Sequence, residues 1–463
     1  MTAAPAPGGG LRRTVPVLLA FVAVFVAAVN LRAGIASLGP VLADVLAAFG
    51  AGGGMAGAVT ALPGLLFAVM GLLAVPLASR FGLSAMLTAG MVLTLVGLVV
   101  RPWVGDIWIF LVLTASVVAG IALANVLLPA WIKNHGGRHI VALMTIYTSV
   151  LGLSGAVGPL SALLFEWRGA LFVWSFLAAA QVVVWLIVAA RTGYDFPSGA
   201  RTRVVEEDTA TAPEAEVAGT APVADEAAQV PEAGGAPTAP DRTPVAPMPE
   251  AGAGSSAPAG WLRGSLWQAP TAVFLMLFFG LQSTNAYIQM GWLPQIYRDA
   301  GVSPAVGSVG LALVGALNVI GGLVMPTVLA RVRSAVLLPV LFSILTAVGY
   351  AGLLLVPDVL PLLWSVILGV GGFCFPTALA LIPASSRDPF VTARLSGFVQ
   401  PFGYCLAAVG PFLVGVAYGR SGDWTLILTV LIVATVLMAL FGSRAARRGF
   451  IDDELMEAAR RRA

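Results

Sequence analysis

The chain has 463 residues, of which 59% are hydrophobic and only 10% are charged, and its formal net charge is +3. So few polar residues cannot cover a soluble globule of this size, which excludes a water-soluble protein. The apolar segments are about 18 to 25 residues long, the length that a helix needs to cross about 30 Å of hydrocarbon. Membrane β-barrels show shorter, alternating segments. The composition therefore predicts an all-α integral membrane protein.

Twelve apolar runs are long enough to span a bilayer. We predict transmembrane helices at residues 15–38, 55–78, 83–100, 107–132, 140–164, 169–190, 267–290, 304–329, 334–356, 361–384, 394–417 and 424–443. The first run is too long, and is followed by too many others, to be a cleaved signal peptide. Because twelve is an even number, both ends of the chain are expected on one side.

Lys and Arg are distributed unevenly between the two sides of the membrane. Twenty of the 25 fall on the side of both chain ends and the middle loop, and only Arg101, Arg168, Arg298 and Arg420 fall on the other. Loops rich in Lys and Arg stay in the cytoplasm. We therefore predict a protein of the cytoplasmic membrane with both termini inside the cell.

The spans fall into two halves of six. We predict a cytoplasmic N-terminus at 1–14, a first half at 15–190, a linker at 191–262, a second half at 263–443 and a basic cytoplasmic tail at 444–463. The linker is rich in Ala, Pro, Gly, Glu and Thr, and it contains eleven acidic residues but only four Arg. Without apolar periodicity it is expected to be disordered, either as a tether or as an interaction or phosphorylation segment.

The two halves repeat each other at an offset near 250 residues. Asn30 followed by Pro40 is matched by Asn285 followed by Pro294, and a stretch ending at Arg80 is matched by one ending at Arg331. The fifth span contains Gly158-Pro159, and the eleventh contains Gly410-Pro411. Two parallel six-helix repeats joined by a long loop are the architecture of major facilitator transporters, whose solute site lies near the midplane. The Gly-Pro pairs indicate either a gating element or a helix bend and close packing.

Arg32 is the formal charge that lies well inside an apolar run, and no Asp or Glu lies inside a run to neutralise it. A guanidinium at the bilayer centre costs roughly 2.5 to 3.5 kcal/mol on insertion scales, so it usually has a function. We interpret Arg32 as an anion-binding residue. It could instead reach the outer surface or pair with backbone carbonyls. Asn30 is two positions away, about 200° around a helix, so both side chains cannot face one cavity unless the helix is loosened.

The other candidate solute contacts are amides and phenols at membrane depth, which could equally serve as contacts between helices. They are Asn125, Tyr147, Asn285, Tyr287, Gln289, Gln400 and Tyr404. Gln400 and Tyr404 are four residues apart and share one helix face. Amides and phenols around one cation suit a compact polar anion.

Several features argue against an enzyme. Neither His nor an acidic residue lies at membrane depth, so general acid-base or nucleophilic chemistry has no candidate group. Cys374 and Cys405 lie in apolar runs without metal or redox spacing, and His135 and His139 flank Arg138 in what reads as a solvated basic turn. No phosphate-binding loop is present. We expect no cofactor, metal or nucleic acid; the expected partners are membrane lipid and a small-molecule solute, and the expected state is a monomer.

Several stretches resemble one branch of the major facilitator superfamily, the cyanate permease and 2-nitroimidazole transporter family. They read AVNLRAGIASLGPVLADV, GIALANVLLPAWIK, NAYIQMGWLPQIYRDAGVSP, FPTALALIPASSRDP and ARLSGFVQPFGYCLAAVGPFLVG. Ala33 stands where that family usually has Pro, and Ser79 stands where the superfamily commonly has Asp before Arg80. Those departures leave the helix at Arg32 and any gating ion pair at Arg80 open.

The leading interpretation is a carrier for a small anion or a small nitrogen-containing polar solute that works by alternating access. The resemblance implies cyanate-like or nitroimidazole-like solutes, in either direction. Efflux of hydrophobic drugs is an alternative, and a membrane sensor that signals through the linker is another. Without an embedded carboxylate other than Asp44 at the margin of the first span, facilitated diffusion, exchange and an anion that carries its own proton all remain open.

Overall fold

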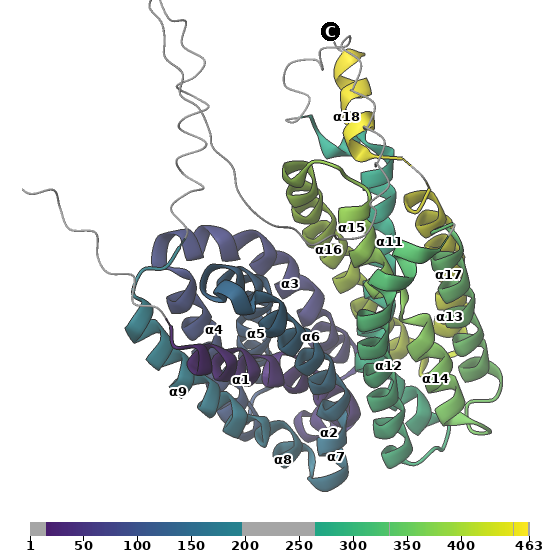
Figure 1. Ribbon diagram of the computed structural model, residues 1–463. Helices are drawn as coiled ribbons and strands as arrows, with labels where there is room; N and C mark the ends of the chain where they lie inside the picture. The colour runs from purple at the N-terminus through teal and green to yellow at the C-terminus, as the bar shows by residue number, and fades with distance from the viewer. Residues whose placement is uncertain (1–14, 197–263, 333, 448, 462–463) are drawn as a thin grey trace, which may run out of the picture. The chain divides into compact units, whose positions relative to one another are not determined.

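The computed structural model describes residues 15–196, 264–332, 334–447 and 449–461. The first half of the chain forms α1 (Val17–Ala36), α2 (Leu38–Phe49), α3 (Gly53–Phe81), α4 (Leu83–Val100), α5 (Ile107–His135), α6 (Ile140–Val157), α7 (Ser161–Leu164), α8 (Trp167–Phe172) and α9 (Trp174–Thr192). Short 3-10 turns, η1 (Arg101–Trp103), η2 (Gly137–His139) and η3 (Gly158–Leu160), connect some of them. Figure 1 shows these helices gathered in one bundle.

The second half forms a bundle of its own (Figure 1). A 3-10 turn, η5 (Leu266–Gln268), precedes α11 (Pro270–Asp299), α12 (Pro304–Arg331), α13 (Leu337–Leu355), α14 (Pro361–Gly371), α15 (Cys374–Ala384), α16 (Pro389–Ser421), α17 (Thr425–Ala445) and α18 (Ile451–Arg460). Most of the predicted linker, residues 197–262, lies outside the described residues, as do residues 1–14.

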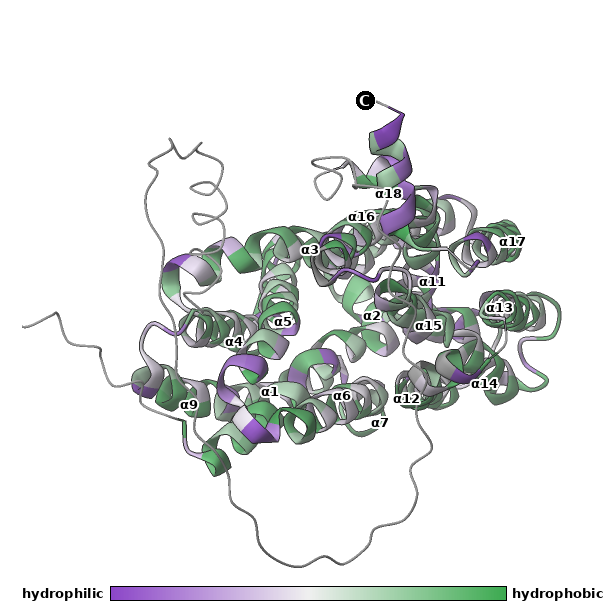
Figure 2. Ribbon diagram, turned by 45° about the horizontal axis from the view of Figure 1, so that its top comes forward, coloured by the Kyte–Doolittle hydropathy of each residue, from purple (hydrophilic) through white to green (hydrophobic). Residues whose placement is uncertain are grey.

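The prediction of twelve membrane-spanning helices is confirmed, since the described residues contain twelve helices of sufficient length and hydropathy. Figure 2 shows that the spanning helices are mostly hydrophobic along their length, whereas α18 is mostly hydrophilic. The chain is an all-α, multi-pass membrane protein.

The first span is shorter than predicted, because the helix breaks at Ser37 and continues as α2. Pro40 has no N–H, so it cannot donate to the carbonyl of Ala36 four residues earlier. The tenth span is likewise divided into α14 and α15 around Gly372, and Pro376 stands four residues later. Both breaks lie in helices that border the site described below.

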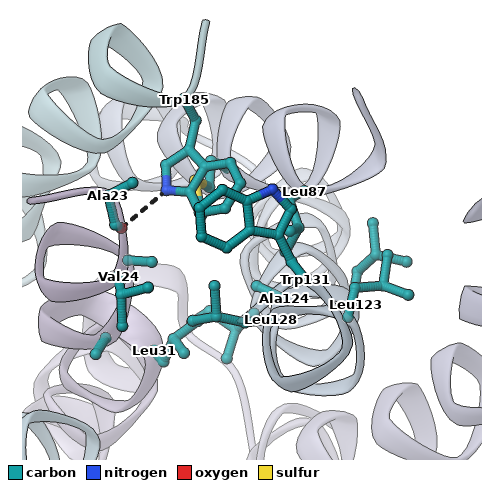
Figure 3. Close-up of a cluster of buried hydrophobic side chains, with 14 of the residues drawn as sticks. Ala23, Val24, Leu31, Leu87, Leu123, Ala124, Leu128, Trp131 and Trp185 are labelled. Carbon is teal, nitrogen blue, oxygen red and sulfur yellow. Dashed lines mark hydrogen bonds between the residues drawn. The ribbon is translucent and has the colours of Figure 1, made fainter. Parts of the chain in front are cut away.

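Large apolar side chains fill the first bundle between α1, α4, α5 and α9. Trp131 and Trp185 are fully buried against each other, with ring centroids 5.0 Å apart. The indole of Trp185 donates to the carbonyl of Ala23 at 3.0 Å, which ties α9 to α1 (Figure 3). This packing fixes the rotation of α1 about its axis, and hence the direction in which its polar residues face.

The two bundles meet most closely at the end of the molecule away from α18, here called the closed end. Gly53 and Gly57 of α3 face Gly415 and Gly419 of α16, so close that a Cβ at Gly415 would lie under 3.0 Å from backbone atoms of α3. Small residues four apart on each helix allow such backbone contact. Nearby, Arg298 of α11 pairs with Asp44 of α2 at 2.9 Å.

Trp292 of α11 donates from its indole N–H to Thr60 of α3 at 3.2 Å, deeper along the same interface. Asp44, placed by the sequence at the margin of the first span, belongs to α2. Its carboxylate is therefore engaged with the other bundle rather than with a solute path.

At the opposite end, carboxylates from two segments of the chain accept hydrogen bonds from groups at helix ends. Asp195 accepts from the backbone N–H and hydroxyl of Ser84 and lies 3.0 Å from His135. Burial raises the pKa of the Asp195 carboxyl, but the hydrogen bonds from His135 and Ser84 outweigh burial and hold it below its usual value of 3.8. The start of the predicted linker is thus packed against α4 and α5, and His135 is not part of a purely solvated turn.

The predicted basic tail contains α18, whose first turns are acidic. Glu454 accepts from the backbone N–H of Thr271 at the start of α11, and Asp452 accepts from the backbone N–H groups of Arg387 and Asp388 just before α16. Carboxylates at helix N-termini satisfy unpaired N–H groups and favour the helix dipole. The tail therefore holds the ends of two spanning helices in the second bundle.

Candidate functional site

A cavity of about 100 Å³ lies where α1 and α6 of the first bundle meet the second bundle. Arg32 and Ala36 of α1 and Gly155 of α6 form one wall. The other walls come from α11, α12, α13, α17 and the break between α14 and α15. Both broken spans thus contribute to the cavity, and the sequence brings it together from residues far apart in the chain.

Arg32 is the only charged side chain on the cavity walls, as far as the described residues go. Its guanidinium is exposed to the cavity and lies 5.8 Å from the ring centroid of Phe375. Gly155 makes room for it, because a Cβ there would lie 3.3 Å from Cδ of Arg32. Within the described ranges no carboxylate pairs with this guanidinium. An unpaired cation in a small apolar space attracts an anion.

Three amides of α11 face the cavity from one side of that helix. Gln282, Asn285 and Gln289 are spaced by three and four residues, which places them on one face. Asn285 donates to the carbonyl of Leu281 at 3.0 Å, and its own Oδ1 is buried without a hydrogen-bond partner in the described structure. Gln289 donates to the hydroxyl of Tyr350 at 3.3 Å. The free amide oxygen of Asn285 can accept a hydrogen bond from an N–H or O–H of a solute.

Two cavity residues on α12 and α13 add further polar groups. Asn318 donates to the carbonyl of Val314 at 3.0 Å, and the hydroxyl of Thr346 donates to the carbonyl of Phe342 at 2.9 Å. The sequence-based selection missed Gln282, Asn318 and Thr346. For Gln282 the spacing to Asn285 and Gln289 was a usable signal, and for Asn318 the signal was a single amide in an apolar run.

Five aromatic rings form a cluster beside the cavity, which one of them, Tyr287, also lines. Tyr404 has its ring centroid 5.4 Å from Phe67, 5.1 Å from Phe279 and 6.3 Å from Tyr287. Phe279 in turn lies 5.8 Å from Phe375. We call these five rings the aromatic cluster. Planar rings beside a cation suit a flat, delocalised solute.

The structure places the predicted site residues in different surroundings. Arg32, Asn285, Tyr287 and Gln289 line the cavity, and Tyr404 belongs to the aromatic cluster. Tyr147 interacts electrostatically with Arg32. Its hydroxyl donates to Asn125 at 3.3 Å, and this hydrogen bond joins α6 to α5. Asn125 and Tyr147 do not line the cavity itself.

Two other predicted solute contacts use their side chains for hydrogen bonds within or between helices. Asn30 is buried and donates to the carbonyl of Trp174 at 3.3 Å and to Gln181 at 3.4 Å, so it faces α9 rather than the cavity. The angular separation from Arg32 thus sends these two side chains to opposite sides of α1. Gln400 donates to Ser396 one turn earlier in α16 at 2.7 Å.

The residues predicted to gate or shape the helices occupy close contacts. A Cβ at Gly158 would lie 3.0 Å from Cα of Ala33, and one at Gly410 would lie under 3.0 Å from Thr284. Pro159 is the second residue of η3, and Pro411 lies inside α16. Arg80 is exposed at the end of α3, with its guanidinium 5.4 Å from the ring centroid of Phe81. These Gly-Pro positions allow tight helix packing.

Comparison with known proteins gives consistent results. The family model described as Major Facilitator Superfamily matches residues 20–411. The chain is 28% identical over 432 residues to the uncharacterized transporter YycB of Bacillus subtilis (strain 168), covering 92% of each. It is 27% identical to the 2-nitroimidazole transporter of Escherichia coli (strain K12), covering 91% of this chain and 93% of that one.

A shorter match links the chain to the cyanate transport protein CynX of Escherichia coli (strain K12), at 33% identity over 34% of this chain and 40% of the relative. Among solved structures, a mutant of the nucleoside transporter NupG aligns with a TM-score of 0.64 at 12% identity, covering 93% of this chain and 99% of that one. At that identity the structural likeness bears on the fold alone.

Proposed function

Because the chain belongs to the Major Facilitator Superfamily, we propose that this transporter moves a small anion or a small nitrogen-containing polar solute by alternating access, with Arg32 as the anion-binding residue. The relatives named for 2-nitroimidazole and cyanate suggest this solute class. We place the protein in the cytoplasmic membrane with both termini in the cytoplasm, as the distribution of Lys and Arg over the loops favours.

The observation that carries the proposal is the unpaired guanidinium of Arg32 on a wall otherwise made of neutral groups. An anion held there would accept from the guanidinium, and the amides of α11 would bond its remaining polar atoms. The free Oδ1 of Asn285 suits a solute N–H. A guanidinium can donate two parallel hydrogen bonds to a planar anion, which Lys cannot.

Cavity size supports the small-solute proposal over drug efflux. Drug-sized ligands generally occupy pockets of about 300–1,000 Å³, whereas this cavity measures about 100 Å³. The aromatic cluster favours flat solutes within the small class, as the relative named a putative anionic 4-hydroxy-benzoate permease of Thauera aromatica also suggests, with 42% identity over 23% of this chain.

Uptake into proteoliposomes tests the role of Arg32. Labelled cyanate, 2-nitroimidazole and 4-hydroxybenzoate would be compared in the wild type, Arg32→Ala, Arg32→Lys and the control Arg420→Ala, whose exposed side chain lies at the closed end. Hydrogen bonds to charged groups contribute about 1.5–3 kcal/mol, so we expect Arg32→Ala to lower uptake of the transported anion at least tenfold. Unchanged uptake in Arg32→Ala would refute the assignment, and retention by Lys would indicate a need for charge alone.

A further inference from the structure

One arginine of the first bundle, unlike Arg32, is buried and does not line the cavity. Arg101 was expected in a loop, yet its side chain is fully buried in η1, at the end of α4. Its Nη2 donates to the carbonyl of Gly34 at 2.9 Å. Its Nε and Nη1 are buried and have no hydrogen-bond partner in the described structure. No ion pair found among the described residues includes Arg101.

Two hydroxyl groups near the same junction of helices are also buried without a hydrogen-bond partner in the described residues. A Cβ at Gly34 would lie 3.4 Å from Leu98 of α4 and 3.7 Å from Val117 of α5, and one at Gly97, one turn before Arg101, would lie under 3.0 Å from Val117. Thr114 lies one turn before Val117 on the same face of α5, and Ser37 lies one turn after Gly34. The side-chain oxygens of Thr114 and Ser37 are buried without a partner in the part of the chain that the structure describes. The helical spacing therefore places both residues at the end of α1 whose Gly34 carbonyl accepts from Arg101.

The chemistry of this junction favours an anion. The Nε and Nη1 of the guanidinium carry three N–H groups without an acceptor, and each hydroxyl can donate one more hydrogen bond. The carbonyl of Gly34 satisfies one guanidinium nitrogen, and the C-terminal end of α1 offsets part of the positive charge. The unpaired Oδ1 of Asn30, close to Gly34, is neutral and can accept from only some of these donors. A buried cation with several free donors requires a negatively charged partner.

We propose that Arg101, Thr114 and Ser37 bind a small monovalent inorganic anion of the chloride type, at a site separate from the cavity that holds Arg32. The anion neutralises the buried guanidinium and accepts from the two hydroxyls. Because the same junction contains the break between α1 and α2, the bound anion joins that break to α4 and α5. It stabilises the first bundle and is not the transported solute.

Thermal unfolding of the purified full chain in detergent tests this site. Chloride would be titrated against gluconate at constant ionic strength, so that general screening does not change. The variants are Arg101→Met, which removes the charge, and Thr114→Val, which removes one hydroxyl. Arg32→Ala is the matched control, because it removes a guanidinium without an ion pair that lines the cavity instead.

We expect chloride to raise the unfolding midpoint of the wild type saturably, by about 2–5 °C. Arg101→Met should lose this dependence, Thr114→Val should need more chloride for the same rise, and Arg32→Ala should keep it. Absence of any chloride effect in the wild type would overturn the proposal, as would an unchanged effect in Arg101→Met. Loss of the effect in Arg32→Ala instead would place the anion in the transport cavity and also overturn it. If Arg101→Met does not fold, the chloride titration of Thr114→Val decides, and an unshifted titration refutes the site.

Discussion

Adding one methyl group at Gly415 should open the closed end of the molecule. A Cβ there would lie under 3.0 Å from Cα and N of Gly57 and from the carbonyl of Gly53, whereas ordinary contacts begin at 3.4 Å. All of these neighbours are backbone atoms, so no side chain can rotate away. The helices α3 and α16 must separate by several tenths of an ångström or more. Gly54 of α3 has open space around it, so Gly54→Ala is the matched control.

The substitution Gly415→Ala should destabilise the state in which this end is closed. Overpacking by a methyl group generally costs about 1–3 kcal/mol. If that cost acts on the closed state alone, the ratio of open to closed molecules rises about 5- to 150-fold. Transport should slow as well, because each cycle must pass through the closed state. Gly54→Ala should leave both quantities within about twofold of the parent.

A buried thiol at the interface reports this equilibrium. Thr60, which accepts from Trp292 across the bundles, would be changed to Cys in a background with Cys374→Ala and Cys405→Ala. The rate of its reaction with a water-soluble maleimide measures how often the closed end opens. Because Thr60→Cys is present in every variant, its own effect cancels. Equal labelling rates in Gly415→Ala and Gly54→Ala would refute the view that the glycine crossing holds this end closed.

The remaining predictions concern the opposite end. Glu454→Ala leaves the start of α11 uncapped and should lower stability by about 0.5–2 kcal/mol in thermal unfolding, whereas Glu457→Ala, in the exposed part of α18, should change it little. Because the folded pKa of Asp195 is lowered, its contribution is present above the unfolded value and is lost as pH falls through the folded value. The midpoint temperature of unfolding should therefore decrease when the pH drops below about 4. This fall should be smaller in Asp195→Asn but unchanged in Asp358→Asn, and equal acid sensitivity in all three proteins would contradict the role of Asp195.

The class of the protein and its twelve spans could be predicted from the sequence alone. Hydrophobic length is a property of consecutive residues, and the bilayer selects for it directly. The unusual position of Arg32 was visible for the same reason, because one charge in an apolar run is a local feature. The order of Gly-Pro and Asn positions also indicated the repeat. Each of these signals lies in the chain itself and needs no knowledge of how the helices pack.

Only the tertiary structure decided which way each side chain faces. The spanning helices are apolar on nearly all sides, so their sequence carries little information about rotation around the helix axis. Asn30 faces α9 while Arg32 faces the cavity, and Arg101 is buried although its position suggested a loop. Gln282 and Asn318 join the cavity only because α11 and α12 turn them inward. Contacts between distant helices set these rotations, so the candidate site emerges from packing rather than from the pattern of any one span.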